Sequence, residues 1–356
     1  MNVGVPKEIK PLEGRIALTP TAVGELVRAG HALYVQTGAG ESSGYSDEDY
    51  RSAGAMLLPD AAALYGHAQL IVKVKEPVAA EYPLLRPEHL LFCYLHLAAV
   101  PELARVLQAK RLTAVAFETV PHGRHLPLLA PMSVIAGKLA VQIGATLLHA
   151  PQGGRGVLLG GLGDAERGRV TVLGAGEAGG AAAALAAALG AEVTVFARSP
   201  ESLARMRALG PNVQAQVSAP EAIETALRAT DLLVGAVLIT GARAPRLVTE
   251  TMVQAMPRGA VIVDISVDQG GCIETIRPTD YSKPTYVAHG VTHFAVTNMP
   301  GAVPRTASQA LSAVLLPYVL RLARADWNTD ADLRAGVNIL NGKLVHPAVA
   351  AALQQA

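Results

Sequence analysis

The chain has 356 residues, which at roughly 150 residues per domain predicts about two domains, each large enough to bury a core. Lysine and arginine number 30 against 29 aspartates and glutamates, and a net charge of +1 provides no field that would attract nucleic acid. Charged residues make up 17% and hydrophobic residues 51% of the chain, which excludes a mainly disordered protein. Cys93 and Cys272 are too few for a disulfide framework and fit a reducing compartment.

The sequence favours a protein without membrane segments or a secretory leader. Residues 284–304 lack charge over the roughly 20 residues that a span needs, but they contain histidines, an asparagine and prolines that lipid would leave unpaired. Other apolar stretches, such as residues 306–320, are shorter. The N-terminus has early lysines but no apolar run after them. We therefore expect a soluble cytoplasmic protein with no membrane partner.

The first part of the chain alternates short apolar runs with helical segments. Such alternation is typical of a parallel sheet, and near-continuous apolar strands are expected where helices cover both of its faces. The predicted strands are residues 2–5, 31–36, 70–74, 91–95 and 113–117, and the predicted helices are residues 21–29 and 101–109.

The pattern changes at Pro131, after which apolar residues recur every three or four positions and predict one long helix. A glycine-rich loop follows, and then a second series of alternating strands and helices. These predicted segments are a loop at residues 152–168, strands at 170–173, 192–196, 232–237 and 260–265, and helices at 178–189 and 306–323.

We interpret the last helix as a return to the first unit, which makes that unit discontinuous. The predicted substrate domain comprises residues 1–130 plus 305–356, and the predicted dinucleotide-binding domain comprises residues 131–304. The predicted fold class is α/β, with two Rossmann-like parallel-sheet domains separated by a cleft and linked by long helices.

The clearest local motif is a G-x-G-x-x-G pattern, GAGEAG, that directly follows a predicted strand and opens an alanine-rich helix. Gly174 allows a tight turn, Gly176 lets the backbone approach a pyrophosphate, and Gly179 permits close packing of helix and strand. The phosphates would lie at the helix N-terminus, where backbone N–H groups favour anions. The motif predicts dinucleotide binding; a tight turn without a ligand is the alternative.

The end of the following strand bears on the choice of cofactor. An NAD site usually has an acidic residue there, about 20 residues beyond the glycines, that binds the ribose hydroxyls. Here Ala197 occupies the strand end and no carboxylate is present. Arg198 with Ser199 could instead accept the 2′-phosphate of NADP, because guanidinium pairs with phosphate in bidentate fashion. The alternative is a solvated Arg198 and NAD held by other contacts, so both cofactors stay open with a slight preference for NADP.

Further segments, in order along nearly the whole chain, resemble those of the bacterial hexameric alanine dehydrogenases. Several matches in order are more specific than one glycine motif. The segments are GVPKEIKPLEGRIALTP, IVKVKEP, LFCYLHLA, APMS, PQGGRGVLLGG, DISVDQGGCIETIRPT and NMPGAVPRTAS. The nucleotide-binding subunit of proton-translocating transhydrogenase and the saccharopine dehydrogenases share this fold, so the fold alone does not fix the activity.

The resemblance implies reversible oxidative deamination of L-alanine to pyruvate and ammonia by a homohexamer with NAD as the cofactor, whereas Ala197, Arg198 and Ser199 leave NADP open. Two alternatives stay open. One is a dinucleotide-binding subunit like that of transhydrogenase, and the other is an NADP-dependent dehydrogenase of another small 2-amino acid. We predict no metal site.

The reaction needs a cation for the substrate carboxylate, and Arg15, in the loop EGRIAL, has a fork that matches one. Lys73 and Lys75 close an apolar strand and by strand alternation point the same way, so we expect one to be paired structurally. The resemblance chooses Lys75 as the cation that binds the keto or imino group. It also makes His96, directly after a predicted strand where ligands collect in α/β folds, catalytic.

Asp264 and Asp268 follow a strand of the nucleotide unit, and such a pair usually combines a structural and a catalytic carboxylate. The resemblance makes Asp268 the active one, and we assign proton transfer to it and His96 without choosing the donor of each step. By resemblance, Ser133 contacts the pyrophosphate, and Asn298 with Met299 lies near the nicotinamide. Helix capping and turn chemistry are the alternatives for these.

Overall fold

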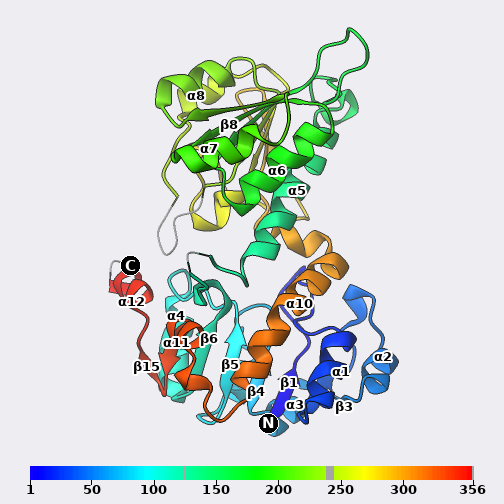
Figure 1. Cartoon of the computed structure of the whole chain (residues 1–356), viewed down its shortest axis with the longest axis vertical. Coiled ribbons are helices and arrows are strands. Elements are labelled where there is room, and N and C mark those ends of the chain that lie inside the picture. The colour runs from blue at the N-terminus through cyan, green and yellow to red at the C-terminus, as the bar shows by residue number, and fades with distance from the viewer. Residues whose placement is uncertain (124, 238–243, 355–356) are drawn as a thin grey trace. The chain divides into compact units, whose positions relative to one another are not determined.

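The computed structural model describes residues 1–123, 125–237 and 244–354. The chain divides into two compact units, and the colours of Figure 1 follow the residue number, so that each unit can be traced along the chain. Unit 1 comprises Met1–Met132 with Gly301–Ala356, and unit 2 comprises Ser133–Pro300. Unit 1 is therefore built from two separate stretches of chain.

Unit 1 contains an eight-stranded sheet in the order β15-β14-β6-β5-β4-β1-β2-β3. Its strands are β1 (Asn2–Val5), β2 (Ala32–Gln36), β3 (Met56–Leu58), β4 (Leu70–Val72), β5 (Leu90–Cys93), β6 (Thr113–Ala116), β14 (Val337–Leu340) and β15 (Lys343–Leu344). The strands from β6 to β3 in this order run parallel. Every residue of β4, β5 and β6 is buried, as expected for strands covered on both faces.

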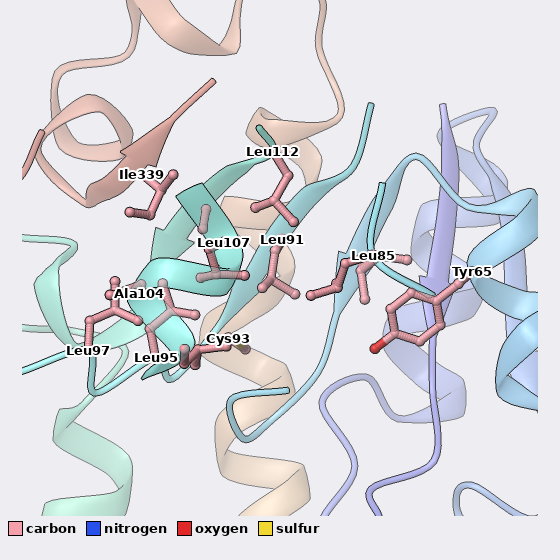
Figure 2. Close-up of a cluster of buried hydrophobic side chains, with 14 of the residues drawn as sticks. Tyr65, Leu85, Leu91, Cys93, Leu95, Leu97, Ala104, Leu107, Leu112 and Ile339 are labelled. Atoms are coloured by element: carbon pink, nitrogen blue, oxygen red, sulfur yellow. The ribbon is translucent and has the colours of Figure 1, made fainter. Parts of the chain in front are cut away.

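The helices of unit 1 begin where residue chemistry favours an N-terminus. Ser46 and Asp49 form a capping box, Asp60 caps the helix after it, and Pro20 and Pro101 occupy first turns. The helices are α1 (Pro20–Arg28), α2 (Asp47–Ser52), α3 (Ala61–His67), α4 (Pro101–Lys110), α10 (Pro304–Leu322), α11 (Ala331–Ala335) and α12 (Pro347–Gln354). Figure 2 shows the core between sheet and helices, where Leu107 of α4 and Leu91 of β5 belong to one buried cluster.

Unit 2 contains a seven-stranded sheet in the order β12-β13-β11-β10-β7-β8-β9. Its strands are β7 (Arg169–Leu173), β8 (Glu192–Ala197), β9 (Val213–Val217), β10 (Leu232–Gly235), β11 (Val261–Asp264), β12 (Thr285–Ala288) and β13 (Val291–Phe294). Its helices are α6 (Glu177–Ala188), α7 (Pro200–Arg207), α8 (Pro220–Leu227) and α9 (Glu250–Gln254), and α5 (Ala130–Leu147) leads into it. The predicted α/β class is confirmed, with two parallel-dominated sheets.

The sheets also have antiparallel edges, which the sequence did not predict. β14 pairs antiparallel with β6 and β15, and β12 pairs antiparallel with β13. An edge strand has one neighbour only and can be added as a hairpin, which the alternation of strands and helices does not reveal. β4 and β5 also end at Val72 and Cys93, two residues before the predicted ends.

Helix α5 is a long apolar helix that the sequence analysis did not identify as a candidate membrane segment. Within the described residues it is the one helix of sufficient length and apolarity to cross a membrane. The search for charge-free runs missed it because Lys138 interrupts it. Its packing is that of a core helix of unit 2: a Cβ on Gly137 would lie 2.1 Å from the Ala178 carbonyl oxygen, and one on Gly144 would lie 2.5 Å from the Leu232 side chain.

Candidate active site

Three predicted site residues of unit 1 follow neighbouring strands of its sheet (Figure 1). Arg15 lies in the loop after β1, Lys75 follows β4, and His96 follows β5, and these strands are adjacent in the order β5-β4-β1. They run parallel, so their carboxyl ends meet at one edge. Ligands of α/β folds bind at that edge. Unit 1 therefore brings its three predicted residues to the position where a site is expected.

Arg15 is buried, with 3% of its surface exposed, and is not a surface loop residue. Its Nε donates to Glu13 Oε1 at 2.7 Å, and its Nη1 lies 3.2 Å from Met132 Sδ. Burial disfavours the charged form, but the hydrogen bond and charge of Glu13 outweigh it and raise the pKa of Arg15. The guanidinium is thus a fixed cation.

The two lysines after β4 have different surroundings. Lys73 is 1% exposed, and its Nζ donates to both carboxylate oxygens of Glu81 at 2.7 and 2.8 Å. Lys75 is half-buried, and its backbone N–H lies 3.4 Å from Glu8 Oε1. Both lie beyond the strand, so the expected strand alternation does not apply to them. The structure identifies Lys73 as the structural lysine of the pair.

Glu8 is a buried carboxylate beneath this bend. Its Oε1 accepts the Val74 N–H at 2.6 Å, while its Oε2 lies 3.7 Å from Lys73 Nζ and has no hydrogen-bond partner. Burial raises the pKa of Glu8 to about 7, although the charge of Lys73 opposes the shift. Sequence reasoning missed Glu8, because a glutamate in a polar loop gives no sign that it is buried.

His96 is partly exposed, with 41% of its side chain accessible. Its imidazole stacks on the Tyr94 ring at 5.8 Å with an interplanar angle of 8°. Its backbone is left-handed, with φ of 46°. Glu118 accepts the His96 N–H at 2.7 Å and was also missed from the sequence.

The glycine turn of unit 2 can accommodate a dinucleotide. Gly174 has φ of 101°, and a Cβ on Gly179 would lie 1.9 Å from the Gly174 carbonyl oxygen, so close packing requires both glycines. A Cβ on Gly176 would meet nothing within 4 Å. Gly176 is also the N-cap of α6 and makes no side-chain cap. Open space in front of uncapped N–H groups fits a pyrophosphate.

Ala197 lies at the end of β8, the strand adjacent to β7, and is 6% exposed. Arg198 is exposed, whereas the Ser199 hydroxyl caps α7 by accepting the Ser202 N–H at 3.2 Å. Arg205 of α7 donates to the Ala175 carbonyl of the glycine turn. Sequence reasoning missed Arg205, because only the tertiary fold brings α7 against that turn.

Asp264 and Asp268 differ in burial, as Lys73 and Lys75 do. Asp264 is fully buried and accepts the N–H groups of Ser266 at 2.8 Å and Cys272 at 2.9 Å. Burial raises the pKa of Asp264 to about 6, and these hydrogen bonds oppose the shift. Asp268 is exposed in the short helix Ile265–Gln269, which follows β11 and ends at Gly270 with φ of 91°. Asp264 is therefore the structural carboxylate.

Three further residues are predicted to contact the cofactor: Ser133, Asn298 and Met299. Ser133 lies in the first turn of α5 and is half-buried. Asn298 follows β13 with a left-handed backbone, φ 63°, which suits turn chemistry. Met299 is 3% exposed, and its carbonyl accepts the Tyr281 hydroxyl at 2.9 Å. In unit 2 the predicted residue Ala197 ends a parallel strand, and Gly174, Asp268 and Asn298 follow parallel strands of the same sheet.

Known proteins are similar to this chain over nearly its whole length. A curated alanine dehydrogenase of Bacillus subtilis is 49% identical over 98% of this chain and 94% of its own length. A solved L-alanine dehydrogenase matches with a TM-score of 0.95 and 49% identity, covering 100% of this chain and 99% of that one. A transhydrogenase from Sinorhizobium meliloti matches with a TM-score of 0.86 and 27% identity, covering 98% and 100%.

Two family descriptions match successive parts of the chain. "Alanine dehydrogenase/PNT, N-terminal domain" matches residues 4–136, and "Alanine dehydrogenase/PNT, C-terminal domain" matches residues 140–347. The chain therefore belongs to the alanine dehydrogenase/PNT family.

Proposed function

We propose that this protein is an L-alanine dehydrogenase, which reversibly deaminates L-alanine to pyruvate and ammonia with NAD or NADP. The main support is the 49% identity to an alanine dehydrogenase over 98% of the chain. The arrangement of Arg15, Lys75 and His96 at one sheet edge supports it further, because the reaction needs a carboxylate-binding cation, a second cation and a proton-transfer group.

Arg15 binds the substrate carboxylate in this proposal. Glu13 holds the guanidinium by Nε and keeps it charged, so the cation does not have to reorganise when an anion arrives. Lys75 binds the oxygen or nitrogen on C2, where its charge stabilises negative charge that develops on oxygen. Lys73 has no such role, since Glu81 holds its ammonium group.

His96 and Asp268 transfer protons. Both side chains are accessible, and the His96 ring stacks on the buried Tyr94. An accessible acid or base can exchange protons with substrate and water. Which of the two acts in each step stays open.

The dinucleotide supplies the nicotinamide that accepts or donates the hydride. The residues proposed to hold it are Gly174, Gly176, Gly179, Ser133, Ala197, Arg198, Asn298 and Met299. The buried alanine at the end of β8 offers no carboxylate to the ribose hydroxyls, and the exposed Arg198 beside it can pair with a 2′-phosphate. We therefore favour NADP over NAD.

The deciding experiment follows the absorbance of reduced cofactor with pyruvate and ammonia, once with NADPH and once with NADH. Turnover with either supports the dehydrogenase. Its absence, with dinucleotide binding intact, would favour the second candidate, a dinucleotide-binding subunit like that of transhydrogenase. The match to the Sinorhizobium meliloti transhydrogenase over 98% of this chain motivates that candidate. Turnover with other keto acids in preference to pyruvate would identify another small 2-amino acid as substrate.

A cytoplasmic homohexamer is the proposed assembly. Its support is the resemblance to the hexameric dehydrogenases. Light scattering coupled to gel filtration should give about six times the chain mass of 36.9 kDa, and a monomer or dimer mass would exclude it.

A further inference from the structure

Glu118 lies one strand away from His96 at the carboxyl edge of unit 1. It belongs to the short helix Phe117–Thr119, which directly follows β6, and β6 pairs with β5 as far as Ala116 and Cys93. Its side chain reaches across to the segment after β5. That side chain is 16% exposed, so a largely buried carboxylate stands beside the proposed catalytic histidine.

The carboxylate accepts the backbone N–H groups of two consecutive residues. Its Oε1 accepts the His96 N–H at 2.7 Å and the Leu95 N–H at 3.2 Å, and its Oε2 is also 3.2 Å from the Leu95 N–H. Hydrogen bonds to an ionised acceptor are roughly twice as strong as those between neutral groups. Glu118 therefore fixes the peptide that carries the imidazole.

That peptide has a conformation that needs such support. His96 has φ of 46°, in the left-handed region, which is unfavourable for a residue with a side chain. The ring is held as well: it stacks on Tyr94, whose hydroxyl donates to the Leu128 carbonyl at 2.7 Å. Backbone and ring of His96 are thus fixed by separate contacts.

The same carboxylate faces the imidazole itself. Glu118 Oε1 lies 3.9 Å from His96 Nδ1, a distance at which it attracts the ring once the ring is protonated. Other titratable groups interact electrostatically with this region: Tyr94 and Cys93 from the β5 side, and His346, which lies between β15 and α12. Arg15 acts on Tyr94 and supplies a cation, so the region is not uniformly acidic.

We propose that Glu118 is the positioning residue of His96, fixing its left-handed peptide and stabilising the protonated imidazole during proton transfer. The proposal rests on the proposed function, since it needs His96 to carry a proton in the reaction. Glu118 itself touches neither substrate nor cofactor in this assignment.

The test compares Glu118→Gln with Glu118→Ala and with the control Glu102→Gln. Glutamine keeps an oxygen acceptor for the N–H groups and removes the charge, whereas alanine removes both. Glu102 is exposed on α4 of the same unit. We expect kcat to fall on the order of 10-fold in Glu118→Gln and further in Glu118→Ala, with KM for pyruvate changed less than about twofold. An unchanged kcat in Glu118→Gln would overturn the proposal.

A double-mutant cycle separates positioning from general stability. In a His96→Gln background, Glu118→Gln should have no further effect on the residual rate, because the charge has lost its target. A fall of the same factor in both backgrounds would show that Glu118 does not act through His96 and would overturn the proposal.

A second readout does not depend on activity. Diethyl pyrocarbonate modifies neutral imidazole, and mass spectrometry can follow the peptide that contains His96. Removal of the carboxylate charge 3.9 Å from Nδ1 should speed the modification of His96 in Glu118→Gln but not in Glu102→Gln. An unchanged rate would refute the role of Glu118, whereas an inactive wild-type enzyme with this acceleration present would refute only the dehydrogenase assignment.

Discussion

Asp268 is the exposed member of the carboxylate pair that follows β11, and Asp264 is the buried one. If Asp268 transfers a proton, Asp268→Asn keeps its size and removes that capacity, so kcat should fall by on the order of 100-fold or more. The dissociation constant of the dinucleotide should change little. Steady-state kinetics and fluorescence titration measure the two. Asp164→Asn, at an exposed loop position of the same unit, is the control, and an unimpaired rate in Asp268→Asn would remove Asp268 from the mechanism.

The prediction of cofactor preference depends on the side chain at position 197. A carboxylate there can accept hydrogen bonds from the ribose hydroxyls and repels a 2′-phosphate, so Ala197→Asp should move the ratio of kcat/KM for NADH to that for NADPH upward by about tenfold or more. Ala204→Asp, on an exposed position of α7, adds the same charge elsewhere and should leave the ratio unchanged. If the ratio stays constant in Ala197→Asp, position 197 does not determine the preference.

Glu8 predicts a pH-dependent stability. Its pKa is raised from 4.5 to about 7 by burial, so between these values the folded chain keeps a proton that the unfolded chain releases. The free energy of unfolding of the wild type therefore falls by about 3 kcal/mol in all as the pH rises through this window. Glu8→Gln has no carboxyl proton to release, so its free energy of unfolding should rise relative to that of the wild type from pH 4.5 to 7.

Urea unfolding at several pH values measures this difference. Glu102→Gln, at an exposed position, should show a constant difference from wild type over the same range. A constant difference for Glu8→Gln as well would mean that the Glu8 carboxyl titrates alike in both states.

At this scale the sequence suggests which residue types form the site, but not how each is held. Arg15, Lys75, His96 and Asp268 were proposed from motif and resemblance. Their partners Glu13, Glu8 and Glu118 were not, because glutamates in loops look like solvated residues until the fold buries them.

At the scale of elements, α5 depends on two glycines that a helix would normally disfavour. Gly137→Ala should raise helix propensity, yet the new Cβ would meet the Ala178 carbonyl oxygen at 2.1 Å. We expect the clash to dominate and to lower the free energy of unfolding by about 1–3 kcal/mol.

Gly24→Ala in α1 is the matched control, since its Cβ would find its nearest neighbours at 3.8 and 4.0 Å. That variant should be stabilised by up to about 1 kcal/mol. Thermal or urea unfolding of both variants measures these changes in the free energy of unfolding. Equal stabilisation of both would contradict the close packing of α5 on α6.

Most strands inside the sheets were predictable from the sequence because buried parallel strands are continuous apolar runs bounded by turns. β1 was predicted at its observed bounds, Asn2–Val5. The short strands β3 and β15, the antiparallel edges, and the parallel strands β9 and β13 were not predicted. β3 and β15 are only two or three residues long, and β9 and β13 contain polar residues, so none of them is a continuous apolar run of ordinary length.

For the whole molecule, a dinucleotide that binds the glycine turn of unit 2 should stabilise the folded chain by mass action. At a ligand concentration of about 100 times its dissociation constant, the free energy of unfolding should rise by about 2.7 kcal/mol. Calorimetry with NADP, NAD and no ligand measures the shift. Gly176→Asp, which places a carboxylate where the phosphates would lie, should abolish it, and a shift that persists in this variant would move the binding site elsewhere.

The sequence by itself determined the two α/β units, the dinucleotide turn and the family, because these depend on local patterns of apolar, glycine and charged residues. Only the tertiary structure decided how the buried member of each pair is held: Glu81 accepts from Lys73, and the N–H groups of Ser266 and Cys272 donate to Asp264. The physical reason is burial. A charge removed from water must be paired or hydrogen-bonded by groups distant in sequence, and only the folded chain brings those groups together.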